Sequence, residues 1–126
     1  MNMILAIAAG GALGAVLRHF VGLFALRHMG SDFPWGTLSV NVIGSFLMGA
    51  LIAWFAHSWN PPAELRGFLT VGMLGAFTTF SSFSLDTVTL WERGATMASM
   101  GYVLASVVLS IGALFAGMML LRQLSA

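Results

Sequence analysis

Long apolar segments separated by short polar turns make up almost the whole chain. Hydrophobic residues dominate four segments, at residues 3–26, 37–56, 65–90 and 97–121. About 20 predominantly apolar residues are enough for a helix to cross a bilayer. The pattern therefore predicts an all-α integral membrane protein with four transmembrane helices, forming a single domain over residues 1–126.

The turns between these segments are rich in residues that interrupt helices. Residues 30–36 read G-S-D-F-P-W-G, residues 60–62 read N-P-P, and residues 91–94 read W-E-R-G. Glycine, proline and asparagine at such positions are typical of turns. Because all three turns are short, we expect an up-and-down bundle without a separate domain outside the membrane.

The third segment contains a stretch that is unusual for a membrane helix. Residues 72–84 read G-M-L-G-A-F-T-T-F-S-S-F-S, with two glycines, two adjacent threonines, three serines and three phenylalanines. Backbone that leaves the helix inside a bilayer is tolerated only where protein or a water-filled cavity satisfies its polar groups. We therefore expect the third helix to be broken at mid-membrane, and the break to mark a binding or conduction site.

Composition narrows the possible functions. Hydrophobic residues make up 59% of the chain and charged residues 7%, whereas a soluble domain averages about 25% charged residues. The chain has no cysteine, which excludes disulfides, thiolate metal sites and a cysteine nucleophile. It has a net charge of +1 and no lysine, so we expect no basic surface for nucleic acid.

The arginines at the predicted turns and ends are balanced between the two sides of the membrane. Arg66 and Arg122 fall on the side of the N-terminus, and Arg27 and Arg93 fall on the other side. The positive-inside rule then gives no preferred orientation. A chain that inserts in both orientations needs equal numbers of arginines on the two sides. The balanced arginines therefore favour an antiparallel, dual-topology homodimer. One orientation set by features other than charge remains the alternative.

Small residues recur at close helical spacing in three of the segments. The sets include Gly10 with Gly14, Gly44 with Ser45 and Gly49, and Gly101 with Ala105. Small side chains let membrane helices approach closely. We expect most of these positions to serve helix packing.

Titratable side chains do not form a catalytic or proton-coupling pattern. Asp32, Glu64 and Glu92 fall in turns, and Asp86 falls in the outer part of the third segment. Proton-coupled transporters commonly use a carboxylate inside the membrane, and none is expected near the centre here. The three histidines have no spacing suited to a metal, and no nucleophile is paired with a base. We therefore expect that the protein is not an enzyme.

Polar and aromatic residues recur along three segments at spacings that place each set on one helix face. The sets are Thr37, Asn41 and Ser45 in the second segment, Phe80 and Phe83 in the third, and Tyr102, Ser106 and Ser110 in the fourth. Serine and threonine in membrane helices usually bond to their own backbone or pack, so each stripe alone shows little. Asn41 differs, because a buried amide needs a partner or a ligand.

If these faces meet, they form a path suited to an anion. Hydroxyl and amide groups are neutral donors, and phenyl rings have a positive edge. Conduction needs binding strong enough to replace hydration but weak enough to release the ion. Arg18 lies within the first segment, where its charge either attracts anions into a vestibule or snorkels to the interface. Both interpretations of Arg18 stay open.

The sequence resembles the Fluc, or CrcB, family of small fluoride channels over essentially its whole length. The resemblance rests on G-A-V-L-R at residues 14–18, G-T-L-S-V-N-V-I-G-S-F at residues 36–46, and the stretch at residues 72–84. The second and third motifs are specific, because several unusual residues coincide at fixed spacing. Two positions depart from the family pattern, Ser82, where threonine is more common, and Asp86, where many members have glutamate.

The resemblance implies a passive fluoride exporter that forms an antiparallel homodimer with two pores in the bacterial inner membrane. It implies contact with membrane lipids and no soluble protein partner. The pore residues it implies are Asn41, Phe80, Phe83, Tyr102, Ser106 and Ser110, with Thr37 on the same track. It also implies a structural sodium ion at the dimer centre, held by the backbone carbonyls of Gly75 and Thr78.

Two other functions are alternatives to a fluoride channel. A small multidrug-type cation exporter has the same size and topology but needs an acidic residue in its first helix, and residues 3–26 contain none. A structural subunit of a larger membrane complex would use the polar stripes as helix contacts. Proton-coupled uptake of lipophilic cations would indicate the exporter, and co-purification with a partner without transport would indicate the subunit.

Overall fold

The computed structural model describes residues 2–125, and this part of the chain is helical apart from short turns. The elements are α1 (Met3–Met29), α2 (Trp35–His57), α3 (Ala63–Gly67), the π-helical η1 (Phe68–Leu74), α4 (Gly75–Phe77), α5 (Phe80–Glu92) and α6 (Thr96–Ser125). Four stretches are long and apolar enough to cross a membrane, namely Met3–Met29, Trp35–His57, Ala63–Glu92 and Thr96–Leu124. The prediction of four membrane-length helices is confirmed.

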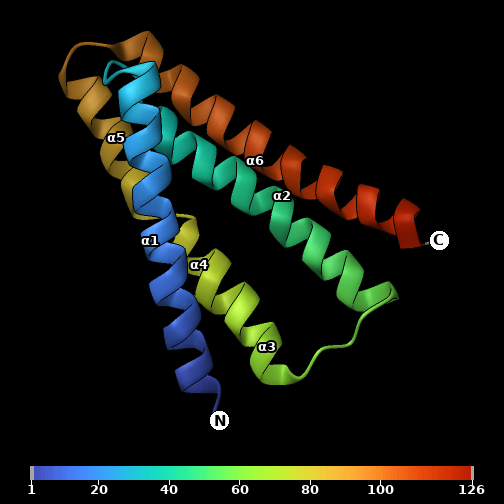
Figure 1. Ribbon diagram of the computed structural model, residues 1–126. Coiled ribbons are helices and arrows are strands. Elements are labelled where there is room, and N and C mark those ends of the chain that lie inside the picture. The colour runs from blue at the N-terminus through green and yellow to red at the C-terminus, as the bar shows by residue number, and fades with distance from the viewer. Residues whose placement is uncertain (1, 126) are drawn as a thin grey trace.

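The helices form two arms that diverge from one end of the molecule (Figure 1). In one arm, α1 packs against α3, η1 and α4. In the other arm, α2 packs along α6. The arms are close together where α1 ends and α2 begins, and they separate toward the α2–α3 connection.

Two glycines end helices in a conformation that other residues rarely adopt. Gly30 has a φ of 82° and follows α1, with its N–H bonded to the carbonyl of Leu26 at 3.2 Å. Gly94 has a φ of 84° and follows α5, with its N–H bonded to the carbonyl of Trp91 at 3.0 Å. A glycine with positive φ is the usual way to satisfy the last carbonyls of a helix. Both turns fall where the sequence predicted them.

Glycines also bring helix backbones into direct contact. A Cβ atom added at Gly10 would meet the backbone of Phe68 in η1, and one added at Gly14 would meet that of Met73. Gly49 in α2 lies in the same way against the backbone of α6. Gly101 is different, because a Cβ atom there would meet nothing within 4 Å. The packing expectation is met at the first three positions but not at Gly101 within this chain.

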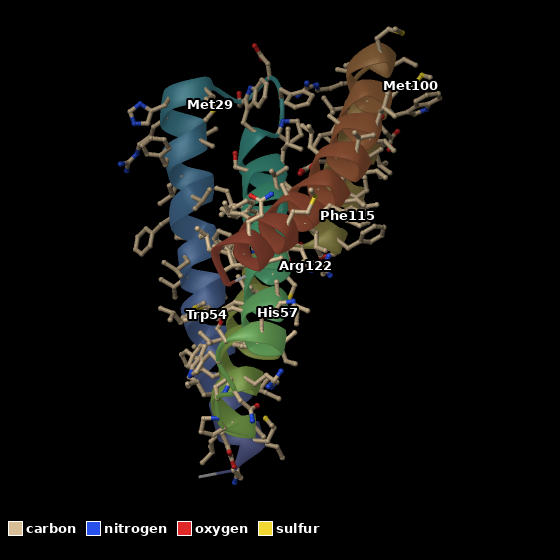
Figure 2. All side chains as sticks on the ribbon, turned by 90° about the vertical axis from the view of Figure 1, so that its right-hand side faces the viewer. Met29, Trp54, His57, Met100, Phe115 and Arg122 are labelled. Atoms are coloured by element: carbon tan, nitrogen blue, oxygen red, sulfur yellow. The ribbon has the colours of Figure 1, made fainter. Side chains whose placement is uncertain are left out.

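Large apolar side chains cover the outside of both arms. Phe20 on α1 and Phe115 on α6 are 59% and 60% exposed, and Figure 2 shows side chains projecting from the helices toward the surroundings. An outer surface of this kind is solvated by lipid or by another apolar protein surface.

A small core forms at the end where the arms meet. Tyr102 is completely buried there between Leu38 of α2 and Leu90 of α5. Phe33, from the α1–α2 turn, and Phe83, from α5, pack against this cluster. The core therefore ties α2, α5 and α6 together beside the space between the arms.

Candidate functional site

The chain leaves the helical conformation between α4 and α5. Thr78 has φ −86° and ψ 160°, and Thr79 has φ −155° and ψ 119°, so both are extended. The Thr78 hydroxyl donates to the carbonyl of Leu74 at 3.0 Å. The Thr79 hydroxyl accepts from the backbone N–H of Ser82 at 3.1 Å and caps the start of α5. The threonine pair therefore both ends one helical segment and starts the next.

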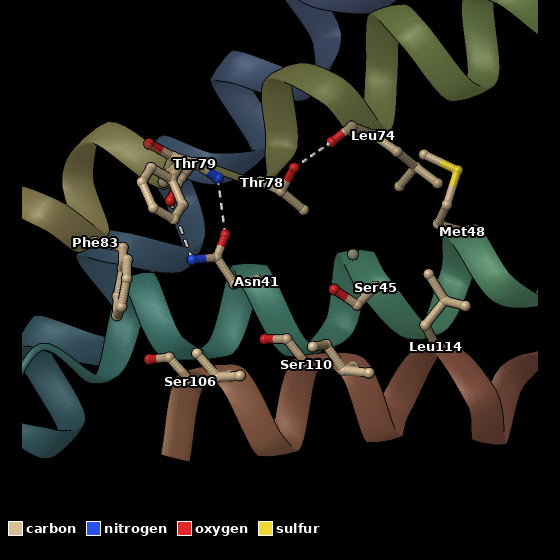
Figure 3. A pocket seen from close by; sticks show the side chains of 14 residues that line it. Asn41, Ser45, Met48, Leu74, Thr78, Thr79, Phe83, Ser106, Ser110 and Leu114 are labelled. Atoms are coloured by element: carbon tan, nitrogen blue, oxygen red, sulfur yellow. Dashed lines mark hydrogen bonds between the residues drawn. The ribbon is translucent and has the colours of Figure 1, made fainter. Parts of the chain in front are cut away.

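Asn41 holds this interruption from the opposite arm (Figure 3). Its side-chain N–H group donates to the carbonyl of Thr79 at 3.1 Å, and its Oδ1 accepts from the N–H of Thr79 at 2.8 Å. These two bonds satisfy the extended backbone in the way a neighbouring strand would. A side-chain amide carries two N–H donors, so one remains after the bond to Thr79. The Asn41 amide, which is partly buried, therefore has a partner and keeps one donor.

Gly44, one helical turn after Asn41, makes room for this contact. A Cβ atom at Gly44 would collide with the methyl group of Thr78. Only hydrogen at this position lets α2 lie against the interruption. The sequence motif around Asn41 therefore combines the bonding group with the clearance it needs.

Arg18 approaches the interruption from α1. Its Nε donates to the carbonyl of Ala76 at 3.0 Å, and the bond is partly buried. A cation near the C-terminal end of a helical segment is favourable, because the unpaired carbonyls there carry partial negative charge. Arg18 does not line either cavity described below. Its bond to Ala76 supports the break, and both roles considered from the sequence stay predictions.

A cavity of about 370 Å³ lies between α2, the α4–α5 interruption and α6 (Figure 3). Its polar and aromatic lining consists of Asn41, Ser45, Thr78, Thr79, Phe80, Phe83, Ser106 and Ser110, and its apolar lining includes Met48, Leu74, Val107, Ile111 and Leu114. We call this space the central cavity. The lining contains no charged residue.

Two serines of α6 line the central cavity and have hydroxyl groups without a bonding partner in the described residues. The Oγ atoms of Ser106 and Ser110 are buried and have no hydrogen bond within the described residues 2–125. Ser99, on the same helix, is also buried but donates to the carbonyl of Thr87 at 2.9 Å. A buried hydroxyl left without a partner costs about 1–3 kcal/mol. The two serines are therefore the clearest sign that something other than this chain bonds here.

Two phenylalanines stand at the start of α5 on the wall of the same cavity. The ring centroids of Phe80 and Phe83 are 5.4 Å apart, with the rings tilted by 56°. Phe80 is 79% exposed, although it is one of the largest apolar side chains in the stretch. Its position contributes little to the core of this chain, so its place on the cavity wall needs another explanation.

Tyr102 and Thr37 lie outside the central cavity. Tyr102 packs behind Phe83, with ring centroids 5.3 Å apart, and its hydroxyl donates to Asp86 Oδ2 at 3.1 Å. Thr37 lines a second cavity together with Asp86. The structure thus places Tyr102 and Thr37 outside the central cavity. The predicted pore residues that do line it are Asn41, Phe80, Phe83, Ser106 and Ser110.

The backbone at Gly75 and Thr78 has unusual bonding. The N–H that would normally bond to the Gly75 carbonyl belongs to Thr79 and bonds to Asn41. The N–H that would bond to the Thr78 carbonyl belongs to Ser82 and bonds to the Thr79 hydroxyl. Within the described residues, His, Asp and Glu side chains form no cluster that could hold a metal. Any cation at this place would depend on backbone carbonyl or threonine hydroxyl oxygen atoms.

Sequence reasoning did not identify Thr79 as part of the site. Thr79 bonds to Asn41 through both backbone groups and caps α5 through its hydroxyl. The adjacent threonines marked the position, but nothing in the sequence showed that the second one would be the partner of the asparagine. Ser45, which belonged to the polar stripe of α2, also lines the cavity.

Comparison with known proteins gives a uniform result. Residues 5–118 match the family described as CrcB-like protein, Camphor Resistance (CrcB). The chain is 57% identical over 122 residues to the fluoride-specific ion channel FluC of Rhodospirillum centenum, covering 97% of each chain. It is 55% identical over 118 residues to the protein of the same name from Agrobacterium fabrum, covering 94% of each. The corresponding Rhizobium meliloti protein is 53% identical over 124 residues, covering 98% of this chain and 99% of the relative.

Proposed function

This chain belongs to the CrcB family, and from that premise we propose that it is a fluoride-specific ion channel. It releases fluoride passively across the membrane and so lowers the concentration inside the cell. It is a channel and not an enzyme. The observation that carries the proposal is the pair of hydroxyls of Ser106 and Ser110, which have no bonding partner within residues 2–125 and belong to residues that line the central cavity together with Phe80 and Phe83.

The cavity lining suits a small, strongly hydrated anion. The hydroxyls of Ser106 and Ser110 and the second N–H of Asn41 are donors that replace water. The edges of the Phe80 and Phe83 rings carry partial positive charge and add weaker contacts. Since no full charge lines the cavity, the anion is bound without being trapped, as conduction requires.

The interruption between α4 and α5 supports this role electrostatically. It starts a new 13-residue helix at Phe80, on the cavity wall. The N-terminus of a helix carries partial positive charge from its unpaired N–H groups. An unbroken helix would place this charge at the membrane surface. The break places it beside the anion path.

We further propose that two copies pair in antiparallel orientation in the bacterial inner membrane. The balanced arginines support dual topology. The high exposure of Phe80 supports a second copy, because a partner surface is needed to enclose an anion path at this ring. Lipid covers the remaining apolar surface, and no soluble protein partner is required.

A structural sodium ion at the dimer centre is part of the proposal. The carbonyls of Gly75 and Thr78 would hold it, since their usual N–H partners bond elsewhere. Gly75 is exposed on the chain, so a neighbouring copy could approach it. Bound there, the ion would supply the positive charge that holds two helix ends together.

Ion release from liposomes tests the function. Purified protein would be reconstituted into vesicles loaded with potassium fluoride or potassium chloride, with valinomycin to balance charge. We expect rapid fluoride release and little chloride release. Asn41→Asp keeps the acceptor for Thr79 but removes the donor and adds a negative charge, so fluoride release should slow by roughly a hundredfold. Equal release of the two anions, or undiminished release by Asn41→Asp, would contradict the proposal.

A further inference from the structure

A second cavity lies at the end of the molecule where the two arms meet. It has a volume of about 320 Å³ and is bounded by the α1–α2 turn and the last turns of α5. Phe33, Thr37, Asp86 and Arg93 are among the residues that line it. We call it the outer cavity. It shares no lining residue with the central cavity.

A row of aromatic rings connects the two cavities. The ring centroids are 5.4 Å apart between Phe80 and Phe83, 5.3 Å between Phe83 and Tyr102, and 5.4 Å between Tyr102 and Phe33. Phe83 lines the central cavity and Phe33 lines the outer one. Tyr102, which lines neither cavity, stands between these two rings. The distance between neighbouring ring centroids therefore stays nearly the same from Phe80 to Phe33 at the rim of the outer cavity.

We propose that the outer cavity is the second mouth of the ion path, with Phe33 and Arg93 at its rim. This inference rests on the proposed fluoride conduction. The edge of the Phe33 ring, the Thr37 hydroxyl and the Arg93 guanidinium are all groups that favour an anion. Phe33 meets Tyr102 edge to face, with an interplanar angle of 87°. A small movement of the turn that carries Phe33 would change the width of the opening.

Arg93 has two effects at this rim. Its Nη2 donates to the backbone carbonyl of Asp32 at 2.8 Å, which fixes the residue next to Phe33. Because that partner is a neutral carbonyl, this bond does not neutralise the positive charge of Arg93. It opposes the carboxylates of Asp32 and Asp86, which line the same cavity. Without Arg93, an anion would meet two carboxylates and no cation.

The charge effect can be separated from the structural effect by salt. The Debye length is about 30 Å at 0.01 M ionic strength and falls to about 3 Å at 1 M. An exposed charge at the mouth accelerates anion passage mainly at low salt. A residue that only holds the turn in place would matter equally at both salt concentrations.

The chain contains no cysteine, so one introduced thiol can be modified selectively. Arg93→Cys would be reconstituted and treated with a cationic or an anionic methanethiosulfonate reagent. At low ionic strength we expect fluoride release to fall by about 3- to 10-fold in Arg93→Cys. The cationic reagent should restore release, and the anionic reagent should lower it further. In 1 M salt of an impermeant anion, the rates of fluoride release by unmodified, cation-modified and anion-modified Arg93→Cys should become equal.

Arg27→Cys is the matched control, because Arg27 is exposed near the same end of α1 but does not line the outer cavity. Its modification should change release by less than twofold. If both variants respond equally, or if both reagents act alike on Arg93→Cys, the outer cavity is not the mouth. A thiol at position 93 that water-soluble reagents cannot reach would also overturn the inference. If Arg93→Cys does not fold, Arg93→Gln and Arg93→Lys replace it, and only the glutamine variant should lose release at low salt.

Wild-type release separates this inference from the proposed function. Absence of fluoride release by the unmodified protein would contradict fluoride conduction itself. Normal wild-type release with no salt-dependent loss in the Arg93 variants would contradict only the assignment of the second mouth.

Discussion

Helices α2 and α6 meet in two different ways along their shared length. Toward the end of α2, Gly49 and Gly117 bring the two backbones into contact, and a Cβ atom at either position would meet the backbone of the other helix. Nearer the start of α2, Asn41 faces the central cavity, whose α6 wall carries Ser106 and Ser110. The region around Gly49 and Gly117, which we call the tight region, leaves no room for a methyl group. The region around Asn41, Ser106 and Ser110, which we call the open region, leaves room for an ion.

The difference shows how a small bundle can keep a polar cavity open. Two buried hydroxyls without partners cost about 1–3 kcal/mol each, and a flexible pair of helices would shift to satisfy or cover them. The glycine contact prevents that shift, because close-packed backbones cannot slide without collision. The tight region therefore maintains the geometry, and the open region provides the chemistry.

The largest effect should come from disturbing the tight region. Gly49→Ala places a methyl group against the carbonyl of Leu114, which is backbone and cannot rotate away. We expect a loss of about 3 kcal/mol or more of stability, seen as a large drop in the amount of monodisperse protein after heating in detergent. Gly101→Ala is the control, since the added methyl group meets nothing, and it should be neutral or slightly stabilising. Equal stability of Gly49→Ala and Gly101→Ala would contradict the inference that backbone contact at Gly49 holds α2 against α6.

A smaller and more selective effect should follow from changes in the open region. Ser106→Ala combined with Ser110→Ala removes two hydroxyls that no group of residues 2–125 bonds. We expect unchanged or higher thermal stability and roughly tenfold slower fluoride release. Ser99→Ala should do the opposite, losing about 1 kcal/mol because Ser99 bonds to Thr87, while release stays near that of the wild type.

The outcome that would refute this prediction is loss of stability in the double serine variant with normal release. The serines would then be packing residues, and the contrast between the two regions of α2 and α6 would have no functional meaning.

The smallest effect should come from Arg18, which supports the break from outside both cavities. Arg18→Met keeps an apolar stem but loses the bond to the Ala76 carbonyl. We expect a loss of about 1–2 kcal/mol in stability and only a two- to threefold change in fluoride release, measured on the same preparations. A severe loss of release at normal stability would instead favour a role for the guanidinium in attracting the anion.

Much of this arrangement followed from regularities in the sequence. Four helices follow from four apolar segments, and a period of about four residues placed Asn41 on one face of α2 and Ser106 with Ser110 on one face of α6. These faces do meet in the structure. Periodicity works here because it depends only on helix geometry, which the bilayer enforces.

Contacts between distant parts of the chain did not follow from the sequence. Asn41 bonds to Thr79, 38 residues away, and Arg18 bonds to Ala76, 58 residues away. These pairings depend on how the arms diverge, which no local pattern encodes. Gly101 makes the same point, since it also belongs to a pattern of closely spaced small residues and yet a Cβ atom added there would meet nothing within 4 Å in residues 2–125.

The central claim is that the open region conducts fluoride, and Phe80 tests it most directly. Phe80 lines the central cavity but is 79% exposed, so replacing it should not unfold the chain. Fluoride release from liposomes would be compared for wild type, Phe80→Ile and Phe20→Ile, the last replacing a lipid-facing ring that is 59% exposed. We predict that Phe80→Ile slows release by at least about tenfold, while Phe20→Ile matches the wild type. Equal release by all three proteins would contradict the account.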